Sequence, residues 1–375
     1  MVLGAEEFAA WFRLLETPGV GRSTARRLLA ACGSPQAIFA NGQAVLREIT
    51  GMAAAQALAS TPPAYAERLA ATQAWLAGGP DRHTLTLGDS TFPPALLQTA
   101  DPPLLLYVQG DPARLAQPSL AVVGSRHPTA QGLENARAFA AALGGQGIVV
   151  VSGLALGIDA AAHEGALSAA AGTVAVVGTG LDRVYPARHR DLAHRIAAHG
   201  ALVSEFAPGT PPLPENFPQR NRIIAGLSQG TLVVEAALQS GSLITARLAL
   251  EAGREVFAMP GSIHAPQSKG CHALLKQGAK LVETAQDIIE ELRGPLFGQR
   301  SEPSTRAVQP AGTSAPAPPA DPLLEALGHD PVTMDALISR TGWPAQDLSA
   351  RLMTLELDGQ VARLPGGLYQ RLHRG

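Results

Sequence analysis

Cysteine and lysine are scarce in this sequence. Its 375 residues include two cysteines, Cys32 and Cys271, which stand far apart and outside any CxxC or ligand cluster. Neither a disulfide framework nor a structural zinc site is therefore supported. The lysines are limited to Lys269, Lys276 and Lys280, so arginine carries nearly all the fixed positive charge. With a formal net charge of -2, any site for a polyanion must be local.

Long apolar runs and nucleotide-binding motifs are also missing. No segment reaches the ~18 unbroken apolar residues of a membrane helix, and Met1 to Ala10 has no basic start followed by an apolar run. We therefore expect a cytoplasmic protein that contacts no membrane. There is no GxxxxGK[ST], no HExxH or other metal spacing, and no GxGxxG after the first clear strand. We expect neither a P-loop ATPase nor a metal or nucleotide cofactor.

The chain is long enough for one large core and one or two small domains. Helical spacing of apolar residues predicts a small helical domain over 1–80. Short β-rich runs that alternate with helical ones predict an α/β domain over 81–293. Residues 294–320, rich in Pro, Ser, Ala and Gly, are typical of a flexible linker. Residues 321–375 form a further module.

The helical domain contains a glycine-rich hairpin. Thr17 to Thr24 reads TPGVGRST and separates a helix that ends near Leu15 from one through Ala25 and Leu28. Free amides of such a hairpin and the following helix N-terminus can hold a phosphate, as in a helix-hairpin-helix or SAM-like domain. A turn with two glycines is also a common connection between two helices, with no ligand involved. Both interpretations stay open.

The alternation of β-rich and helical runs in the α/β domain predicts an extended Rossmann-like, mainly parallel sheet with helices on both faces. Seven segments have the composition of strands: Leu104 to Val108, Leu120 to Val123, Ile148 to Val151, Thr173 to Val177, Ala201 to Ser204, Leu232 to Glu235 and Glu255 to Ala258.

The last module has the pattern of a winged helix. Three helices (Pro322 to Leu327, Met334 to Ser339, Ala345 to Asp358) precede two short strands, Gln360 to Leu364 and Leu368 to Gln370. The third helix of this fold usually reads DNA. Here it carries Asp347, Glu356 and Asp358 against one base, Arg351. Such a helix repels phosphates, so a protein-contact or regulatory role is favoured.

Ligands of an open α/β sheet bind beyond the carboxyl ends of its strands. The loops at those ends are rich in glycine, serine and basic residues, which suit phosphate oxygens. The candidate residues are Gly124, Ser125, Arg126, Ser152, Gly153, Ser240, Gly241, Ser242 and Lys269. Glycine also simply permits tight strand-to-helix turns, but several such loops at one edge favour a phosphate site.

A further candidate segment begins at Phe217, where Arg220, Asn221 and Arg222 open an apolar helix. Guanidinium groups form bidentate hydrogen bonds with phosphate and stack on bases. Alternatively, one of the two arginines makes an internal salt bridge with a nearby carboxylate, Glu205 or Glu235.

His163, Asp159, Glu205 and Glu235 resemble an acid-base set. A histidine four residues after an aspartate on one helix face is at least as often a buried hydrogen-bond partner. We favour that structural interpretation over catalysis.

At these residues the chain resembles the DprA/Smf family of DNA-processing proteins. The resemblance covers about Phe92 to Glu283. Its motifs are Val122-Val123-Gly124-Ser125-Arg126, Ser152-Gly153-Leu154-Ala155, Gly157-Ile158-Asp159 with His163, Tyr185-Pro186, Ser204-Glu205, Phe217 to Ser228, Glu235-Ala236, Ser240-Gly241-Ser242, Pro260-Gly261 and Gly278-Ala279.

The resemblance implies a single-stranded DNA-binding protein that dimerises, shields incoming DNA during natural transformation and helps to load the RecA recombinase. It implies DNA contacts from Arg126, Arg220, Arg222 and Lys269, with phosphate donors from Ser152 and Gly153. Many members have a lysine after Tyr-Pro, where this chain has Ala187-Arg188-His189, so Arg188 is a candidate replacement.

Two other functions compete with this one. The fold also resembles nucleotide phosphoribohydrolases, which carry PGGxGTxxE after a late strand. The corresponding stretch, Ser240 to Leu248, has no glutamate three residues beyond Thr245, and hydrolysis of the glycosidic bond needs such a carboxylate. A protein scaffold without nucleic acid is the third possibility. Four basic residues facing one pocket would repel one another without a polyanion, which argues against it.

Overall fold

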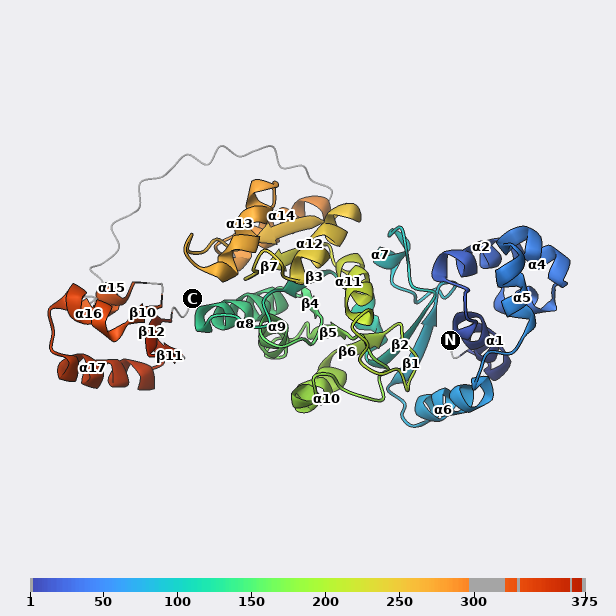
Figure 1. Cartoon of the computed structure of the whole chain (residues 1–375), viewed down its shortest axis with the longest axis horizontal. Helices are drawn as coiled ribbons and strands as arrows, with labels where there is room; N and C mark the ends of the chain where they lie inside the picture. The colour runs from blue at the N-terminus through green and yellow to red at the C-terminus, as the bar shows by residue number, and fades with distance from the viewer. Residues whose placement is uncertain (1–2, 297–320, 329–330, 365, 373–375) are drawn as a thin grey trace.

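The computed structural model describes residues 3–296, 321–328, 331–364 and 366–372 (Figure 1). The predicted linker falls mostly on 297–320, outside the described residues. Helix α14 extends to Leu296, so helical backbone continues three residues into the segment predicted as linker.

The first part of the chain is helical, and its apolar residues, Phe12 and Leu28 among them, share one core with Leu105 and Tyr107 of the sheet domain. Its six helices are α1 (Ala5–Glu16), α2 (Arg22–Cys32), α3 (Pro35–Ala40), α4 (Gln43–Thr50), α5 (Met52–Ala59) and α6 (Tyr65–Ala77). The Trp75 ring meets Tyr107 of the sheet edge-on, with centroids 6.3 Å apart. This contact joins the helical part to the sheet beside β1 and β2 (Figure 1).

A nine-stranded sheet forms the centre of the molecule, in the order β1-β2-β6-β5-β4-β3-β7-β8-β9. The strands are β1 (Arg82–Thr86), β2 (Leu105–Gly110), β3 (Ser119–Val123), β4 (Val149–Ser152), β5 (Thr173–Val176), β6 (Ala201–Ser204), β7 (Gly230–Val233), β8 (Glu255–Ala258) and β9 (Lys280–Leu281). Strands β3 to β9 pair in parallel, whereas β2 pairs antiparallel with both β6 and β1. The predicted Rossmann-like, mainly parallel sheet is confirmed.

Helices cover both faces of this sheet because the β-strands are buried on both sides. Side chains such as Leu120 and Val150 face one layer, while Ala121 and Val151 face the other. The first layer contains α8 (Ala130–Gly145), α9 (Ile158–Ala166), α10 (Arg190–His199) and α14 (Ala285–Leu296). The second contains α7 (Pro94–Leu97), α11 (Asn216–Leu227), α12 (Ser242–Glu251) and α13 (Lys269–Lys276).

The strand order reverses between β3 and β7. From β3 the chain proceeds to β4, β5 and β6 on one side, then returns to place β7 and β8 on the other. The loops after β3 and β7 therefore diverge and leave a crevice at the carboxyl edge, which is where open α/β sheets bind ligands.

The last module is a winged helix, as predicted. It comprises α15 (Pro322–Leu327), β10 (Val332–Thr333), α16 (Met334–Thr341), α17 (Ala345–Leu357), β11 (Val361–Leu364) and β12 (Leu368–Arg371). Its strands pair antiparallel in the order β10-β12-β11. Leu337, Leu348 and Leu352 are among the buried residues of its separate core.

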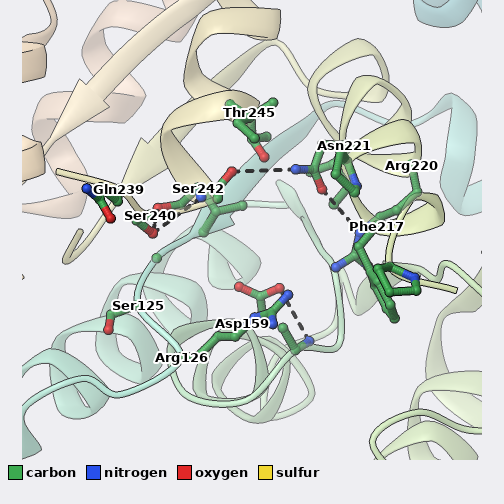
Figure 2. A pocket seen from close by; sticks show the side chains of 18 of the residues that line it. Ser125, Arg126, Asp159, Phe217, Arg220, Asn221, Gln239, Ser240, Ser242 and Thr245 are labelled. Carbon is green, nitrogen blue, oxygen red and sulfur yellow. Dashed lines mark hydrogen bonds between the residues drawn. The ribbon is translucent and has the colours of Figure 1, made fainter. Parts of the chain in front are cut away.

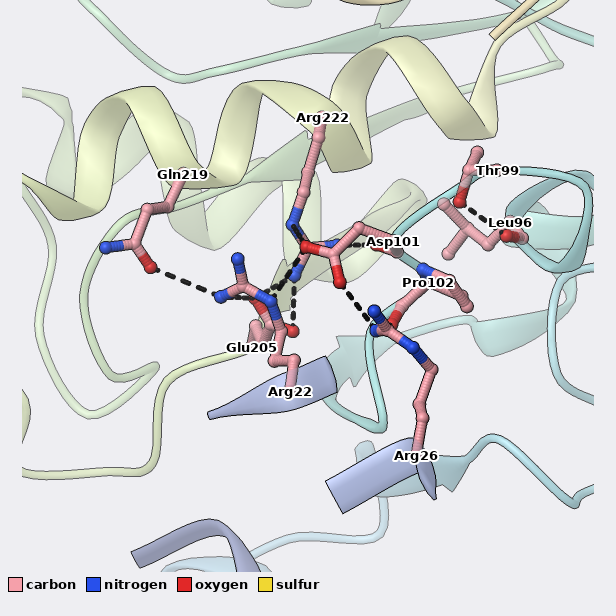
Figure 3. Close-up of polar contacts among 9 residues, drawn as sticks. All are labelled: Arg22, Arg26, Leu96, Thr99, Asp101, Pro102, Glu205, Gln219 and Arg222. Carbon is pink, nitrogen blue, oxygen red and sulfur yellow. Dashed lines mark hydrogen bonds and ion pairs between the residues drawn. The ribbon is translucent and has the colours of Figure 1, made fainter. Parts of the chain in front are cut away.

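Three arginines and two carboxylates, here called the arginine cluster, join the N-terminal helices to the sheet domain (Figure 3). Asp101 forms ion pairs with Arg22 (2.9 Å), Arg26 (2.5 Å) and Arg222 (3.2 Å). Arg222 also donates to both carboxylate oxygens of Glu205. The arginines lower the pKa of Asp101 against the opposing effect of burial. Because Arg22 opens α2, the glycine-rich hairpin adjoins the sheet domain.

Asp101→Asn is expected to destabilise the protein by about 1–2 kcal/mol at neutral pH, because three charge-assisted contacts at a half-buried site are weakened. The folded pKa lies below the unfolded value of about 3.8, so this stabilisation is present above that pH and is lost as pH falls through the folded pKa. Urea unfolding of both proteins at pH 7, 5 and 3 should show the difference shrinking only at the lowest pH. A constant difference would contradict this prediction.

Candidate nucleic-acid interface

The crevice between the loops after β3 and β7 holds a pocket of about 670 Å³, here called the switch-point pocket. It is lined by Gly124, Ser125, Arg126, Asp159, Tyr185, Phe217, Arg220, Asn221, Ser240, Gly241, Ser242 and Thr245, among others (Figure 2). Nine of the fourteen residues predicted from the sequence thus meet in one place. Prolines 212 and 214, from the loop after β6, also line the pocket and were missed, although the run Pro211-Pro212-Leu213-Pro214 is a visible signal.

Arg126 is an exposed cation of this pocket. It follows β3 in a short loop whose Ser125 amide donates to the Glu235 carbonyl at 2.7 Å. Gly124 is required there because an added Cβ would come within 2.8 Å of that same carbonyl. The Arg126 side chain is exposed and makes no hydrogen bond or ion pair within the described part of the chain. Its charge is therefore available to a ligand.

Arg220 contributes differently, because it is only 5% exposed. Its guanidinium donates to the carbonyls of Gly153 and Val176, and its Nε donates to Asn221 Oδ1 at 3.2 Å. Burial lowers the pKa of Arg220 to about 10, although nearby Asp159 acts in the opposite direction. The group stays charged at neutral pH and ties the ends of β4 and β5 to α11.

The N-terminus of α12 forms the opposite wall. Ser240 Oγ lies 2.7 Å from Ser242 Oγ, and Asn221 Nδ2 donates to the Gly241 carbonyl at 3.5 Å. A helix start lined by hydroxyls favours an anion. The N-terminus of α8 already has an anion from the protein itself. The Glu235 carboxylate accepts hydrogen bonds there from Thr129 N (2.9 Å) and Thr129 Oγ1 (2.6 Å).

Two aromatic side chains stand at the pocket's rim. The rings of Tyr185 and Phe217 are 5.5 Å apart at 44°, and Arg220 Cζ lies 6.0 Å from the Phe217 centroid. Tyr185 is half exposed. Together the pocket offers a cation, an anion-binding helix start and π-faces, which are the groups that single-stranded nucleic acid contacts.

Family models match each of the three parts of this chain. A family model described as DNA recombination-mediator protein A matches residues 83–293. The chain belongs to this family, the DprA/Smf family. Models of a DprA winged helix domain and of a SAM-like helix-hairpin-helix tandem match residues 307–367 and 13–59. The predicted fold class is confirmed in all three parts.

Relatives within the DprA/Smf family span most of the chain. Protein Smf of Escherichia coli is 45% identical over 296 residues, 79% of each chain. The crystal structure of DNA processing protein A from Streptococcus pneumoniae has a TM-score of 0.65 at 36% identity, covering 78% of this chain and 99% of that one. A Helicobacter pylori structure, titled for its unique single-stranded DNA binding mode, has a TM-score of 0.52 at 33% identity, covering 56% and 96%.

Five predicted residues lie outside the switch-point pocket. Arg222 is engaged by Asp101 and Glu205 in the arginine cluster, which confirms the alternative of an internal salt bridge. Lys269 donates to the Ile263 carbonyl, and Arg188 is exposed on the turn 187–189. The prediction that Arg126, Arg220, Arg222 and Lys269 all face one pocket is therefore wrong. Of these four residues, the pocket lining contains Arg126 and Arg220. A DNA contact by the other basic residues stays a prediction.

Ser152 and Gly153 do not offer free donors, contrary to expectation. Ser152 is fully buried and donates to the Val122 carbonyl at 2.6 Å. The Gly153 amide donates to Asp159 Oδ2 at 3.1 Å. The strand end and the following loop satisfy these donors internally. A phosphate contact by the two residues stays a prediction. Gly153 does border a small recess beside Arg126 and Arg220.

The histidine and acids of the apparent acid-base set have structural partners. Thr173 Oγ1 donates to the Val150 carbonyl and so accepts from His163 Nδ1 at 2.7 Å. His163 Nε2 accepts from the Leu154 amide at 3.3 Å. Burial lowers the pKa of His163 to about 3, whereas burial raises the pKa of Asp159. His163 is a buried hydrogen-bond partner, and the described residues hold no cluster suited to a metal ion.

His163 is expected to stay neutral, with its proton on Nδ1, from pH 8 down to pH 5. Its folded pKa lies below the unfolded value of about 6.5, so the unfolded chain takes up the proton first and this residue destabilises the fold as pH falls from 6.5 toward 3. Carbon-13 histidine NMR, with His163→Gln for assignment, should show one of ten histidine signals unchanged over that range. A signal for His163 that titrates near pH 6.5 would refute this.

Gly153→Ala is expected to destabilise the protein by about 1–3 kcal/mol through overpacking, because an added Cβ would overlap the Arg220 guanidinium. Oligothymidine affinity should fall as Arg220 is displaced. The matched control is Gly145→Ala on α8, where a Cβ meets open space and stability should hold or rise slightly. Chemical denaturation of both variants tests this, and equal stability would show that Arg220 moves freely.

Proposed function

We propose that this chain binds single-stranded DNA in the switch-point pocket and holds it without covalent chemistry. The observation that carries the proposal is the exposed Arg126, which forms no ion pair among the described residues and lines the same pocket as the α12 N-terminus, with Tyr185 and Phe217 at the rim. Arg126 binds a phosphate of the strand, and the bases stack on the rings of Tyr185 and Phe217. The solved relative from Helicobacter pylori, whose title names single-stranded DNA binding, supports this choice of ligand.

The pocket favours a single strand over a duplex. Its volume of about 670 Å³ lies within the usual range of small-ligand sites, about 300–1,000 Å³, whereas a duplex is a wide, stiff cylinder whose bases are stacked inside. A single strand can turn individual nucleotides into a pocket and expose its π-faces. Backbone contacts carry no sequence information, so we expect weak sequence preference.

We further propose that the protein acts in the cytoplasm as a homodimer that protects incoming DNA during transformation and promotes RecA loading. Membership of the DprA/Smf family supports this proposal. Two pockets on one dimer would increase affinity for a long strand through effective concentration. The described helices include none long and apolar enough to span a membrane.

A nucleotide-hydrolysing enzyme has less support from the same site. Glu235, the carboxylate nearest to such a role, caps the start of α8 through Thr129 and does not line the pocket. His163 has hydrogen-bond partners on both ring nitrogens. Asp159 is the carboxylate that lines the pocket, and it accepts hydrogen bonds from two backbone amides.

The test is fluorescence anisotropy with labelled oligothymidine and with duplex of the same length, at about 50 and about 200 mM salt. We expect tight binding of the single strand, a steep loss of affinity with salt and little duplex binding. Release of free base from nucleoside monophosphates is assayed in parallel. Equal retention of both DNA forms would refute the single-strand preference, and base release lost in Glu235→Gln would establish the enzyme instead.

A further inference from the structure

The winged helix presents an unusual outer face on α17. Leu348, Leu352 and Leu355 are buried in the core of the module and define the inner face of this helix. On the opposite side, Met353 is 65% exposed and Leu357 is 80% exposed. Large apolar side chains this exposed cost hydration free energy, and a group of them on one face indicates an interaction site.

The exposed apolar residues form one stripe. Ala350, Met353 and Leu357 follow the spacing i, i+3, i+7, which places them one above another on a helix. All three are exposed. At 100° per residue the stripe points directly away from the buried leucines. The stripe is therefore a second apolar face, beyond the one that folding of the module requires.

Acidic residues flank this stripe on both sides. Asp347 and Asp358 lie along one edge and Glu356 along the other, and all three are exposed. Within the described residues none of them forms an ion pair. The one base of the helix, Arg351, is bound to Asp321 through Nε (2.9 Å) and Nη2 (2.5 Å). The outer face is thus apolar at its centre and negative at its margins.

This charge pattern discriminates between possible occupants. A DNA phosphate backbone would meet uncompensated carboxylates and be repelled. A second copy of α17 would set Asp347, Glu356 and Asp358 against like charges, whether the helices ran parallel or antiparallel. A helix with an apolar stripe flanked by lysine or arginine matches both features, in the manner of a coiled-coil seam with charged borders.

We propose that the outer face of α17 is a docking site for an amphipathic helix of a partner protein, with an apolar stripe bordered by basic residues. Met353 and Leu357 pack into the partner's stripe, while Asp347, Glu356 and Asp358 pair with its basic flanks. The winged helix then serves to recruit a partner protein. This surface lies apart from the switch-point pocket and does not depend on the DNA-binding proposal.

The experiment uses the full chain and a fluorescent synthetic 21-residue helical peptide with leucines in one stripe and lysines on both flanks. A companion peptide carries glutamates in place of the lysines. Anisotropy should show binding of the basic peptide only, weakened by salt. Leu357→Asp and the pair Asp347→Lys with Glu356→Lys should each weaken it about tenfold or more, since each removes a packing or charge contact. Leu250→Asp, a 52% exposed leucine of α12, is the matched control and should bind as wild type does.

Other outcomes would overturn the proposal. Absence of basic-peptide binding, or equal binding to Leu357→Asp and wild type, would refute the docking site. Reduced duplex DNA binding in Met353→Ala with Leu357→Ala would show that α17 reads DNA. Self-association lost in Leu357→Asp, measured by sedimentation, would assign the face to a second copy of the chain.

Discussion

Arg126→Ala is expected to weaken binding of labelled oligothymidine by about 10- to 100-fold, the usual effect of losing a charged hydrogen bond to phosphate. Arg126 forms no hydrogen bond or ion pair among the described residues. Its charge does act on buried Asp159, so its removal is expected to cost the fold about 0.5–1 kcal/mol. The slope of log affinity against log salt should also fall by about 0.7, the value for one phosphate contact on a single strand. Anisotropy over a series of salt concentrations measures both quantities.

The matched control for this change is Arg195→Ala on α10. Arg195 is likewise exposed, and it lies outside the switch-point pocket. The variant loses the same overall charge, so it should bind DNA as wild type does and keep its salt slope. Equal losses in the two variants would mean that general electrostatics, not the pocket, holds the DNA.

Arg220→Met should instead unfold the site, with a loss of stability of about 3 kcal/mol, because buried acceptors lose their donor. The carbonyls of Gly153 and Val176 lose a shared partner, and buried Asp159 loses the nearby positive charge. Arg220→Lys should recover little, since an ammonium lacks the planar fork that reaches both carbonyls. Urea denaturation measures the change in the free energy of unfolding.

A second variant separates structure from binding at this position. Adding Asp159→Asn to Arg220→Met removes the uncompensated carboxylate and should restore part of the lost stability. DNA affinity should stay low in the double variant because the pocket wall is still rearranged. Wild-type stability in Arg220→Met together with lost DNA binding would make Arg220 a ligand contact and not a structural tie.

The sequence predicts the sheet well because each central strand is a continuous apolar run, buried on both faces. It misses β1 and β9. The segment Arg82–Thr86 is short and polar and is held by antiparallel pairing with β2, and β9 has only two residues. Strand β7 also begins and ends two residues earlier than predicted. Such elements depend on a neighbouring strand, which local composition does not contain.

The candidate site was predictable as a set of loops but not as a set of side-chain directions. Arg220 and Arg222 stand two residues apart on α11 and so point about 200° apart. One faces the pocket and the other faces Asp101 and Glu205. The helical spacing of Arg220 and Arg222 alone predicts that the two side chains cannot both face the pocket. The internal partners of Ser152 and Glu235 could not be found in this way, because they lie on other strands and helices.

The most direct test of the central claim is to map where DNA lies on the protein. Oligothymidine containing 4-thiothymidine is cross-linked to the full chain by light, and the linked peptides are identified by mass spectrometry. Cross-links are expected at Tyr185, Phe217 and the loops 124–126 and 240–242, and they should decrease in Arg126→Ala. Cross-links confined to residues 5–77 or to 321–372 would contradict the account and move the DNA to the helical domain or the winged helix.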